Sequence, residues 1–167
     1  DAYRERLSQF IYHSGLIMKP VFAGAKRAPK RVVYAEGEDE RVLRAVQVVV
    51  DEGLAKPVLI GRPEVIAARI GKFGLRIRAG TDFELVNINS DPRYRECSQL
   101  YYQIMGRKGV SPEEAREAVL RKPSVIGTLL LRMGACDALV CGPVGKYEAH
   151  LRHVADVIGR SPDAPVF

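Results

Sequence analysis

Two short apolar runs, each about the length of a strand, flank an amphipathic segment in the first third of the chain. The runs cover residues 31–35 and 56–61. The segment between them carries one apolar stripe at helical spacing, formed by Val42, Ala45, Val46 and Val49. A helix between two buried strands predicts a right-handed βαβ unit, and therefore a parallel sheet.

Strand and helix patterns continue to alternate after this unit. Helices are expected over residues 63–72, 90–106 and 147–158, and a short strand is expected over 83–88. Ser111 and Glu114 have the spacing of a capping box, so another helix begins there. Residues 125–133 are apolar nearly all round, which predicts a buried helix. Together these patterns predict a three-layer α/β/α fold with a mostly parallel sheet.

The apolar run at residues 137–141 ends in a Gly/Pro-rich loop at 142–146. A strand covered on both faces, followed by a glycine turn and a helix, is a common frame for binding an anion, and Lys146 adds a positive charge. An ordinary turn that reverses the chain explains the same residues. The glycine spacing of a nucleotide phosphate loop is missing, and Tyr147 stands where such a loop has a hydroxyl that binds magnesium.

Two other groups could carry chemistry. Cys141 could be a nucleophile beside the loop, with Lys146 as the only nearby group by sequence that could favour the thiolate, but a small buried cysteine is the favoured interpretation. Cys136, expected on the same strand, would point to the opposite face and cannot pair with it. His150 and His153 share a helix face and could ligate a metal with Asp156, although surface or interface histidines are favoured.

Composition narrows the class of protein. Of 167 residues, 47% are hydrophobic, which is enough for a packed core, and the formal net charge is +6. The basic residues are scattered apart from a cluster at residues 26–31, and aromatic side chains do not alternate with them, so nucleic acid is not expected as a partner. We expect no membrane segment, because no apolar run approaches about 20 residues. Three cysteines without disulfide spacing and the lack of a signal peptide indicate the cytoplasm.

Residues 1–29 are expected to form a helical arm or linker ahead of an α/β module at residues 30–167. Apolar residues between Tyr3 and Ser14 have helical spacing, and Pro20 either kinks this arm or starts a second helix. Such an arm would join the module to an upstream part or pack on a partner subunit.

Several motifs carry a resemblance to a known family. YAEGEDERVL at residues 34–43, KPVLIG at 56–61 and ACDALVCG at 135–142 together resemble the N-terminal half of the phosphotransacetylase family. YRERL at 3–7, SGLIMKP at 14–20 and NINSDPRY at 87–94 are similar to the large bacterial NADP-dependent malic enzymes, which carry a phosphotransacetylase-like domain at the C-terminus. The resemblance implies a truncated fold of the phosphotransacetylase and isocitrate dehydrogenase type, with the catalytic residues of the transferases in a second half that this chain lacks.

The resemblance also implies a function. We expect a domain that binds acetyl-CoA as an effector, forms homo-oligomers and is itself not catalytic, in one chain with a malic enzyme catalytic domain. NADP and a divalent metal, Mg or Mn, would belong to that catalytic domain, which oxidatively decarboxylates malate to pyruvate, and no cofactor is expected here. An active phosphate acetyltransferase, which converts acetyl-CoA and phosphate to acetyl phosphate and CoA, and a purely structural oligomerisation domain stay open as alternatives.

Two departures from the transferase pattern favour the regulatory interpretation. Met105 stands where transferases have an arginine, and the loop at 142–146 lacks the hydroxyl groups that they carry there. No catalytic and no metal-binding residue is therefore expected. The residues expected to bind acetyl-CoA are Arg107, Lys108, Cys141, Gly142, Gly145 and Lys146.

Overall fold

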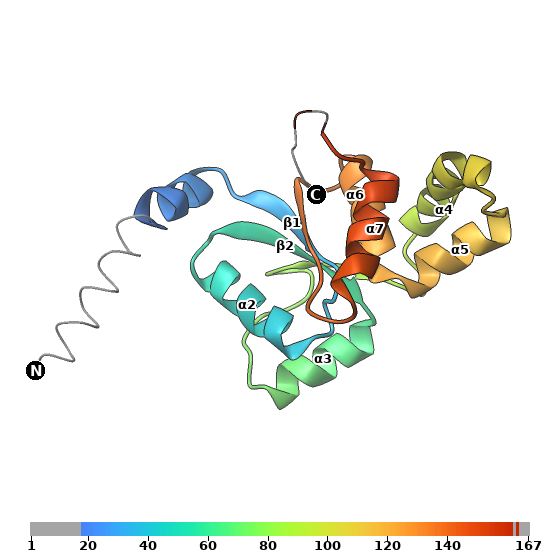
Figure 1. The fold of residues 1–167 in the computed structure, drawn as a ribbon. Coiled ribbons are helices and arrows are strands. Elements are labelled where there is room, and N and C mark those ends of the chain that lie inside the picture. The colour runs from blue at the N-terminus through green and yellow to red at the C-terminus, as the bar shows by residue number, and fades with distance from the viewer. Residues whose placement is uncertain (1–17, 162, 164–167) are drawn as a thin grey trace, which may run out of the picture.

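The computed structural model describes residues 18–161 and residue 163. The helix expected between Tyr3 and Ser14 lies outside these residues. Residues 18–27 are helical and include Pro20, and this helix projects from the body of the molecule (Figure 1). Lys26 near its end pairs with Glu52 at 2.8 Å. Among the described residues, no helix combines the length and the hydropathy needed to cross a membrane.

Four parallel strands form the central sheet, in the order β3-β2-β1-β4. They are β1 (Lys30–Tyr34), β2 (Ala55–Gly61), β3 (Glu84–Asn87) and β4 (Ala138–Val140). Alternate residues of a strand point to opposite faces, so Val33 packs into one hydrophobic cluster and Tyr34 into another. Helices cover both faces, which confirms the expected α/β fold with a parallel sheet.

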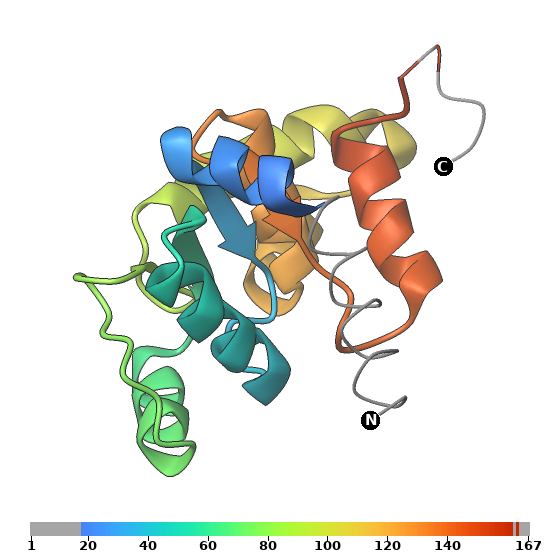
Figure 2. The ribbon, with the colours of Figure 1, turned by 90° about the vertical axis from the view of Figure 1, so that its left-hand side faces the viewer.

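Helices α2 (Glu40–Asp51) and α3 (Pro63–Lys72) cover one face of the sheet. In both views they lie on the side of the strands away from α7 (Tyr147–Val157) (Figures 1 and 2). The buried residues of α2 are Val42, Leu43 and Val46. The expected stripe is right at Val42 and Val46, whereas Ala45 is exposed and Val49 is only half-buried. Leu43, outside the expected stripe, is fully buried instead. The larger side chain of Leu43 turns toward the sheet, since more apolar area is removed from water that way.

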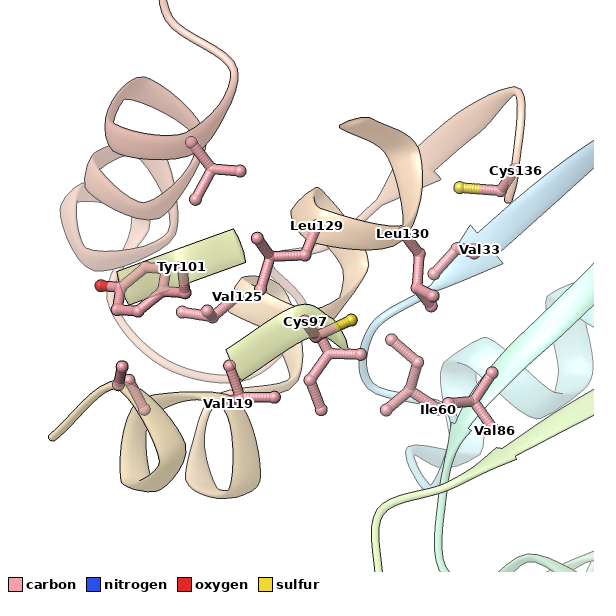
Figure 3. Close-up of a cluster of buried hydrophobic side chains, with 14 of the residues drawn as sticks. Val33, Ile60, Val86, Cys97, Tyr101, Val119, Val125, Leu129, Leu130 and Cys136 are labelled. Atoms are coloured by element: carbon pink, nitrogen blue, oxygen red, sulfur yellow. The ribbon is translucent and has the colours of Figure 1, made fainter. Parts of the chain in front are cut away.

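The other face is covered by α6 (Pro123–Arg132) and α7 (Tyr147–Val157), with α4 (Arg93–Met105), the short 3₁₀ helix η1 (Gly106–Lys108) and α5 (Pro112–Arg121) packed beyond them (Figure 1). Side chains from α4, α5 and α6 converge there on Val33, Ile60 and Val86 of the strands (Figure 3). As predicted, α6 is buried over most of its length.

The helix start predicted at Ser111 is confirmed. The Glu114 N–H donates to Ser111 Oγ at 3.2 Å, and the Ser111 N–H donates to Glu114 Oε2 at 2.8 Å. Both bonds satisfy backbone donors that a first helical turn leaves without partners.

The strand expected at residues 137–141 is shorter and less buried than predicted. It spans three residues, and Val140 is 48% exposed. The reason is its place in the sheet, because β4 pairs with β1 alone among the described strands and forms an edge. Cys136 and Cys141 flank the strand, and both are free thiols.

Candidate functional site

The candidate site lies at the carboxyl ends of β1 and β4. From β1 the chain continues through α2 to β2 on one side, whereas β4 lies on the other side of β1. The loops after these two strands therefore diverge, and such a point in a parallel sheet is where ligands usually bind. The loops concerned are residues 35–39, here called the β1 loop, and residues 141–146, here called the β4 loop.

A carboxylate of the β1 loop holds the β4 loop. The Gly142 N–H lies 3.2 Å from Oε1 and 3.3 Å from Oε2 of Glu36. The N–H of Ala35 also donates to the carbonyl oxygen of Val140 at 3.0 Å. A backbone donor that could have met the anion of a ligand is thus occupied by a side chain of the protein itself.

The first turns of α7 and α2 add two further contacts to the β4 loop. His150 Nε2 donates to the carbonyl oxygen of Val144 at 2.7 Å, and its buried Nδ1 lies 3.6 Å from Glu36 Oε1. Because a carbonyl can only accept, Nε2 carries a proton. Arg41 donates to the carbonyl oxygen of Pro143 at 2.6 Å and also pairs with Asp39, the N-cap of α2. The β4 loop is therefore tied down at Gly142, Pro143 and Val144.

A cavity of about 640 Å³ opens beside these loops. Its lining combines the β1 loop, the ends of β2 and β3, the first part of α6 and the β4 loop, and includes Glu36, Glu38, Asp39, Arg62, Arg69, Asn89 and Val144. This volume falls within the range of small-molecule sites, roughly 300–1,000 Å³.

Glu38 is a carboxylate of the cavity that an arginine holds by a bidentate pair. It accepts hydrogen bonds from Arg62 Nε at 2.9 Å and from the second guanidinium nitrogen at 2.8 Å. The side-chain hydrogen bond from Arg62 lowers the pKa of Glu38 against the opposing effect of burial. Gly61 makes room for this pair, since a Cβ there would lie 2.9 Å from the Glu38 Cγ atom.

Four of the predicted ligand residues come together in the β4 loop. Gly142 and Gly145 have φ angles of +114° and +105°, which glycine adopts readily and other residues rarely do. Lys146 is exposed at the N-cap of α7. Cys141 is half-buried, and burial first and then the Glu36 charge raise the pKa of its thiol. A neutral thiol is a poor nucleophile, so this environment does not activate Cys141.

The two other predicted ligand residues lie at the far end of α7. Arg107 and Lys108 belong to η1, and Lys108 Nζ pairs with Asp156 at 2.9 Å. Asp156 follows Lys146 by ten residues, which along a helix corresponds to about 15 Å. The role of all six residues in binding acetyl-CoA stays a prediction. Met105, one of the two sequence departures from the transferase pattern, is buried in the core at the end of α4.

The two histidines do not act together. His153 Nδ1 lies 2.7 Å from Ser124 Oγ, on the side of α7 that faces α6, and burial lowers the pKa of this imidazole. His150 points to the β4 loop instead. Within residues 18–161 and 163, no group of three His, Cys, Asp or Glu side chains could hold a metal ion.

Sequence reasoning missed the residues that define this cavity. Residues 36–40 form an acidic run just ahead of a helix, a pattern that predicts a role at the dipole of α2, but only Asp39 and Glu40 lie at that helix start. Glu36 and Glu38 turn to Gly142 and Arg62 instead. The sequence feature that could have identified Glu36 and Glu38 is their position directly after β1, at the carboxyl edge of the sheet. Arg69 gave no signal, because it looks like any charged residue of an amphipathic helix.

Comparisons with known proteins place the fold and the family. The family model for phosphate acetyl/butaryl transferase matches residues 16–167. The NAD-dependent malic enzyme of Rhizobium meliloti (strain 1021) is 55% identical over 161 residues, 96% of this chain and 21% of that protein. The NADP-dependent malic enzyme of Escherichia coli (strain K12) is 52% identical over 159 residues, 95% of this chain and 21% of that protein.

A solved structure shares the fold of this chain. The EutD phosphotransacetylase from Staphylococcus aureus superposes with a TM-score of 0.76 at 24% identity, over 89% of this chain and 45% of that one. The chain spans about a fifth of the length of the two malic enzymes.

Proposed function

Because the chain belongs to the phosphate acetyl/butaryl transferase family, we propose that it is an acetyl-CoA-binding regulatory domain of a malic enzyme. The malic enzymes that match almost the whole chain support this context. A catalytic part of the same polypeptide would oxidatively decarboxylate malate to pyruvate with NADP or NAD and a divalent metal, Mg²⁺ or Mn²⁺. Binding of acetyl-CoA to this domain would change the rate of that reaction.

The observation that carries the proposal is the state of the β4 loop. It reaches the carboxyl edge of the sheet beside a cavity of about 640 Å³, but its Gly142 N–H is taken by Glu36. Residues 141–146 contain no serine or threonine, and the pKa of the Cys141 thiol is raised. A loop of this kind can contact a ligand, yet it contains no hydroxyl group and no activated thiol that could act as a nucleophile.

Regulation requires that acetyl-CoA binds one state of the assembly better than another. Coupling free energies of this kind are typically about 1–3 kcal/mol. Three apolar side chains near the same edge of the sheet, Val140, Val144 and Tyr147, are 48%, 53% and 69% exposed. Exposed apolar side chains that lie close together often mark interfaces, so these residues support a homo-oligomer as part of the proposal.

The test is calorimetric titration of the full-length protein with acetyl-CoA, together with the malic enzyme rate with and without this effector. We expect binding, a changed rate, and a several-fold loss of affinity in K146Q. The matched control is K56Q, because Lys56 is also exposed but lies at the amino end of β2. Wild-type protein that binds no acetyl-CoA would refute the proposal.

An active phosphate acetyltransferase is the second candidate, because the family that the chain belongs to is named for that activity. It predicts acetyl-CoA formation from acetyl phosphate and CoA by the full-length protein, and measurable turnover would place this function ahead of the regulatory one.

A purely structural oligomerisation domain is the third candidate. It would keep the assembly but show no response to acetyl-CoA, and removal of the charges of Arg107 and Lys146 would leave malic enzyme regulation intact.

A further inference from the structure

One charged side chain of the cavity beside the β1 loop differs from its neighbours. The Arg62 guanidinium forms a bidentate pair with Glu38, and Arg41 forms one with Asp39. Arg69 instead donates to the main-chain carbonyl oxygen of Glu38, and no ion pair between described residues includes it. Arg69 is therefore the arginine of the cavity lining whose charge is not matched by a carboxylate at contact distance.

The position of Arg69 on α3 aims its side chain at the cavity. Long helical side chains point toward the N-terminus of their helix, and the N-terminus of α3 follows directly on β2 at the carboxyl edge of the sheet. The half-buried side chain reaches across to the β1 loop, where the hydrogen bond to the Glu38 carbonyl fixes it. Of the five N–H donors of a guanidinium, this bond uses one, and no other hydrogen bond between described residues involves the Arg69 side chain.

The remaining lining defines what kind of ligand fits. The positive charge of Arg69 also acts on the Glu38 carboxylate. After the contributions of Arg62, this charge helps to lower the pKa of Glu38. Glu36 is engaged by the Gly142 N–H and faces His150 rather than Arg69. Ile60, Ile88, Pro123 and Val144 add an apolar portion to the wall. A ligand with an anionic group and a less polar body matches this combination.

We propose that Arg69 binds a phosphate group of the ligand in this cavity. A guanidinium held by one backbone bond presents two parallel donors, and this geometry matches a phosphate better than a single ammonium does. The assignment rests on the proposed function, because the ligand concerned is acetyl-CoA with its phosphate groups. It adds a residue on α3 to a site so far assigned to the β4 loop and η1.

The experiment compares two acetyl thioesters, acetyl-CoA and acetylpantetheine, which lacks the nucleotide phosphates. Calorimetric titrations of the full-length protein use wild type, R69Q, R69K and the control R76Q. Arg76 is exposed and pairs with Asp51 at 2.8 Å away from the cavity. We expect R69Q to weaken acetyl-CoA binding about tenfold or more, since hydrogen bonds to charged groups are strong. R69K should fall between wild type and R69Q, and R76Q should match wild type.

Acetylpantetheine separates a phosphate contact from an effect on the shape of the cavity. Its affinity should be equal in wild type and R69Q, which also shows that the variant keeps its fold. An equal loss for both thioesters would overturn the assignment of a phosphate contact. Equal acetyl-CoA affinity of wild type and R69Q would overturn the role of Arg69 and leave the proposed function intact. Absence of acetyl-CoA binding in wild type would overturn both.

Discussion

Replacement of Gly37 by alanine is the most direct test of how the β1 loop is built. A Cβ at this position would lie 2.7 Å from the Ile60 carbonyl oxygen and 2.9 Å from the Leu59 Cβ atom. Both neighbours are close to the backbone of β2, so rotation of a side chain cannot relieve the contact. The loop has to move away from the sheet.

The expected cost follows from two terms. Overpacking of a well-packed site typically costs about 1–3 kcal/mol. The Gly37 N–H donates to the Ile60 carbonyl oxygen at 3.1 Å, and loss of this bond adds about 1 kcal/mol. We therefore expect G37A to lower the free energy of unfolding by about 2–4 kcal/mol. Because Gly37 lies between Glu36 and Glu38, the shift would also disturb both carboxylates of the candidate site.

Urea unfolding of the purified chain, followed by circular dichroism, measures this change. With a slope of about 2 kcal/mol/M, the midpoint should fall by about 1–2 M urea. G71A is the matched control, because Gly71 lies inside α3 with open space around its missing Cβ. Alanine should stabilise that helix by about 0.5–1 kcal/mol. A G37A midpoint equal to that of wild type would show that the β1 loop is not packed against β2 as described.

Three other changes test the electrostatics and the core. E36Q removes a charge that raises the pKa of the Cys141 thiol, so the pH profile of its alkylation by iodoacetamide should move to lower pH; an unmoved profile would contradict the contact. Arg93 lowers the pKa of Asp91 below its usual 3.8, so this pair stabilises the fold above that pH and loses its effect as pH falls further. D91N should therefore cost about 1–3 kcal/mol at pH 7, and the difference from wild type should shrink toward pH 3. L129A truncates a fully buried side chain and should cost about 2–5 kcal/mol in urea unfolding, whereas a loss below 1 kcal/mol would argue against its burial.

Much of the fold could be predicted because its elements depend on local patterns. The capping box at Ser111 needs only a hydroxyl and a carboxylate three residues apart, and both bonds form as expected. The apolar runs of β1 and β2 and the helix between them suffice for a parallel βαβ unit. The resemblance in the motifs at 34–43, 56–61 and 135–142 agrees with the family match over residues 16–167.

The candidate site was predicted only where its residues are neighbours in sequence. Cys141, Gly142, Gly145 and Lys146 form one loop, so the sequence alone brings them together. Lys108 was grouped with them, but its distance from the loop depends on how α4 packs against α7, and the structure places it beside Asp156.

The amino-acid sequence by itself determined most strands and helices and the cap at Ser111, because each depends on spacing within about a dozen residues, and its motifs carried the resemblance to the family. Only the tertiary structure decided that Glu36 meets a backbone N–H 106 positions later and that Arg69 reaches the carbonyl of Glu38. Such contacts arise where a parallel sheet brings the ends of distant strands to one edge. No local pattern encodes that meeting, since the same charges on a solvent-exposed helix or turn would look identical in the sequence.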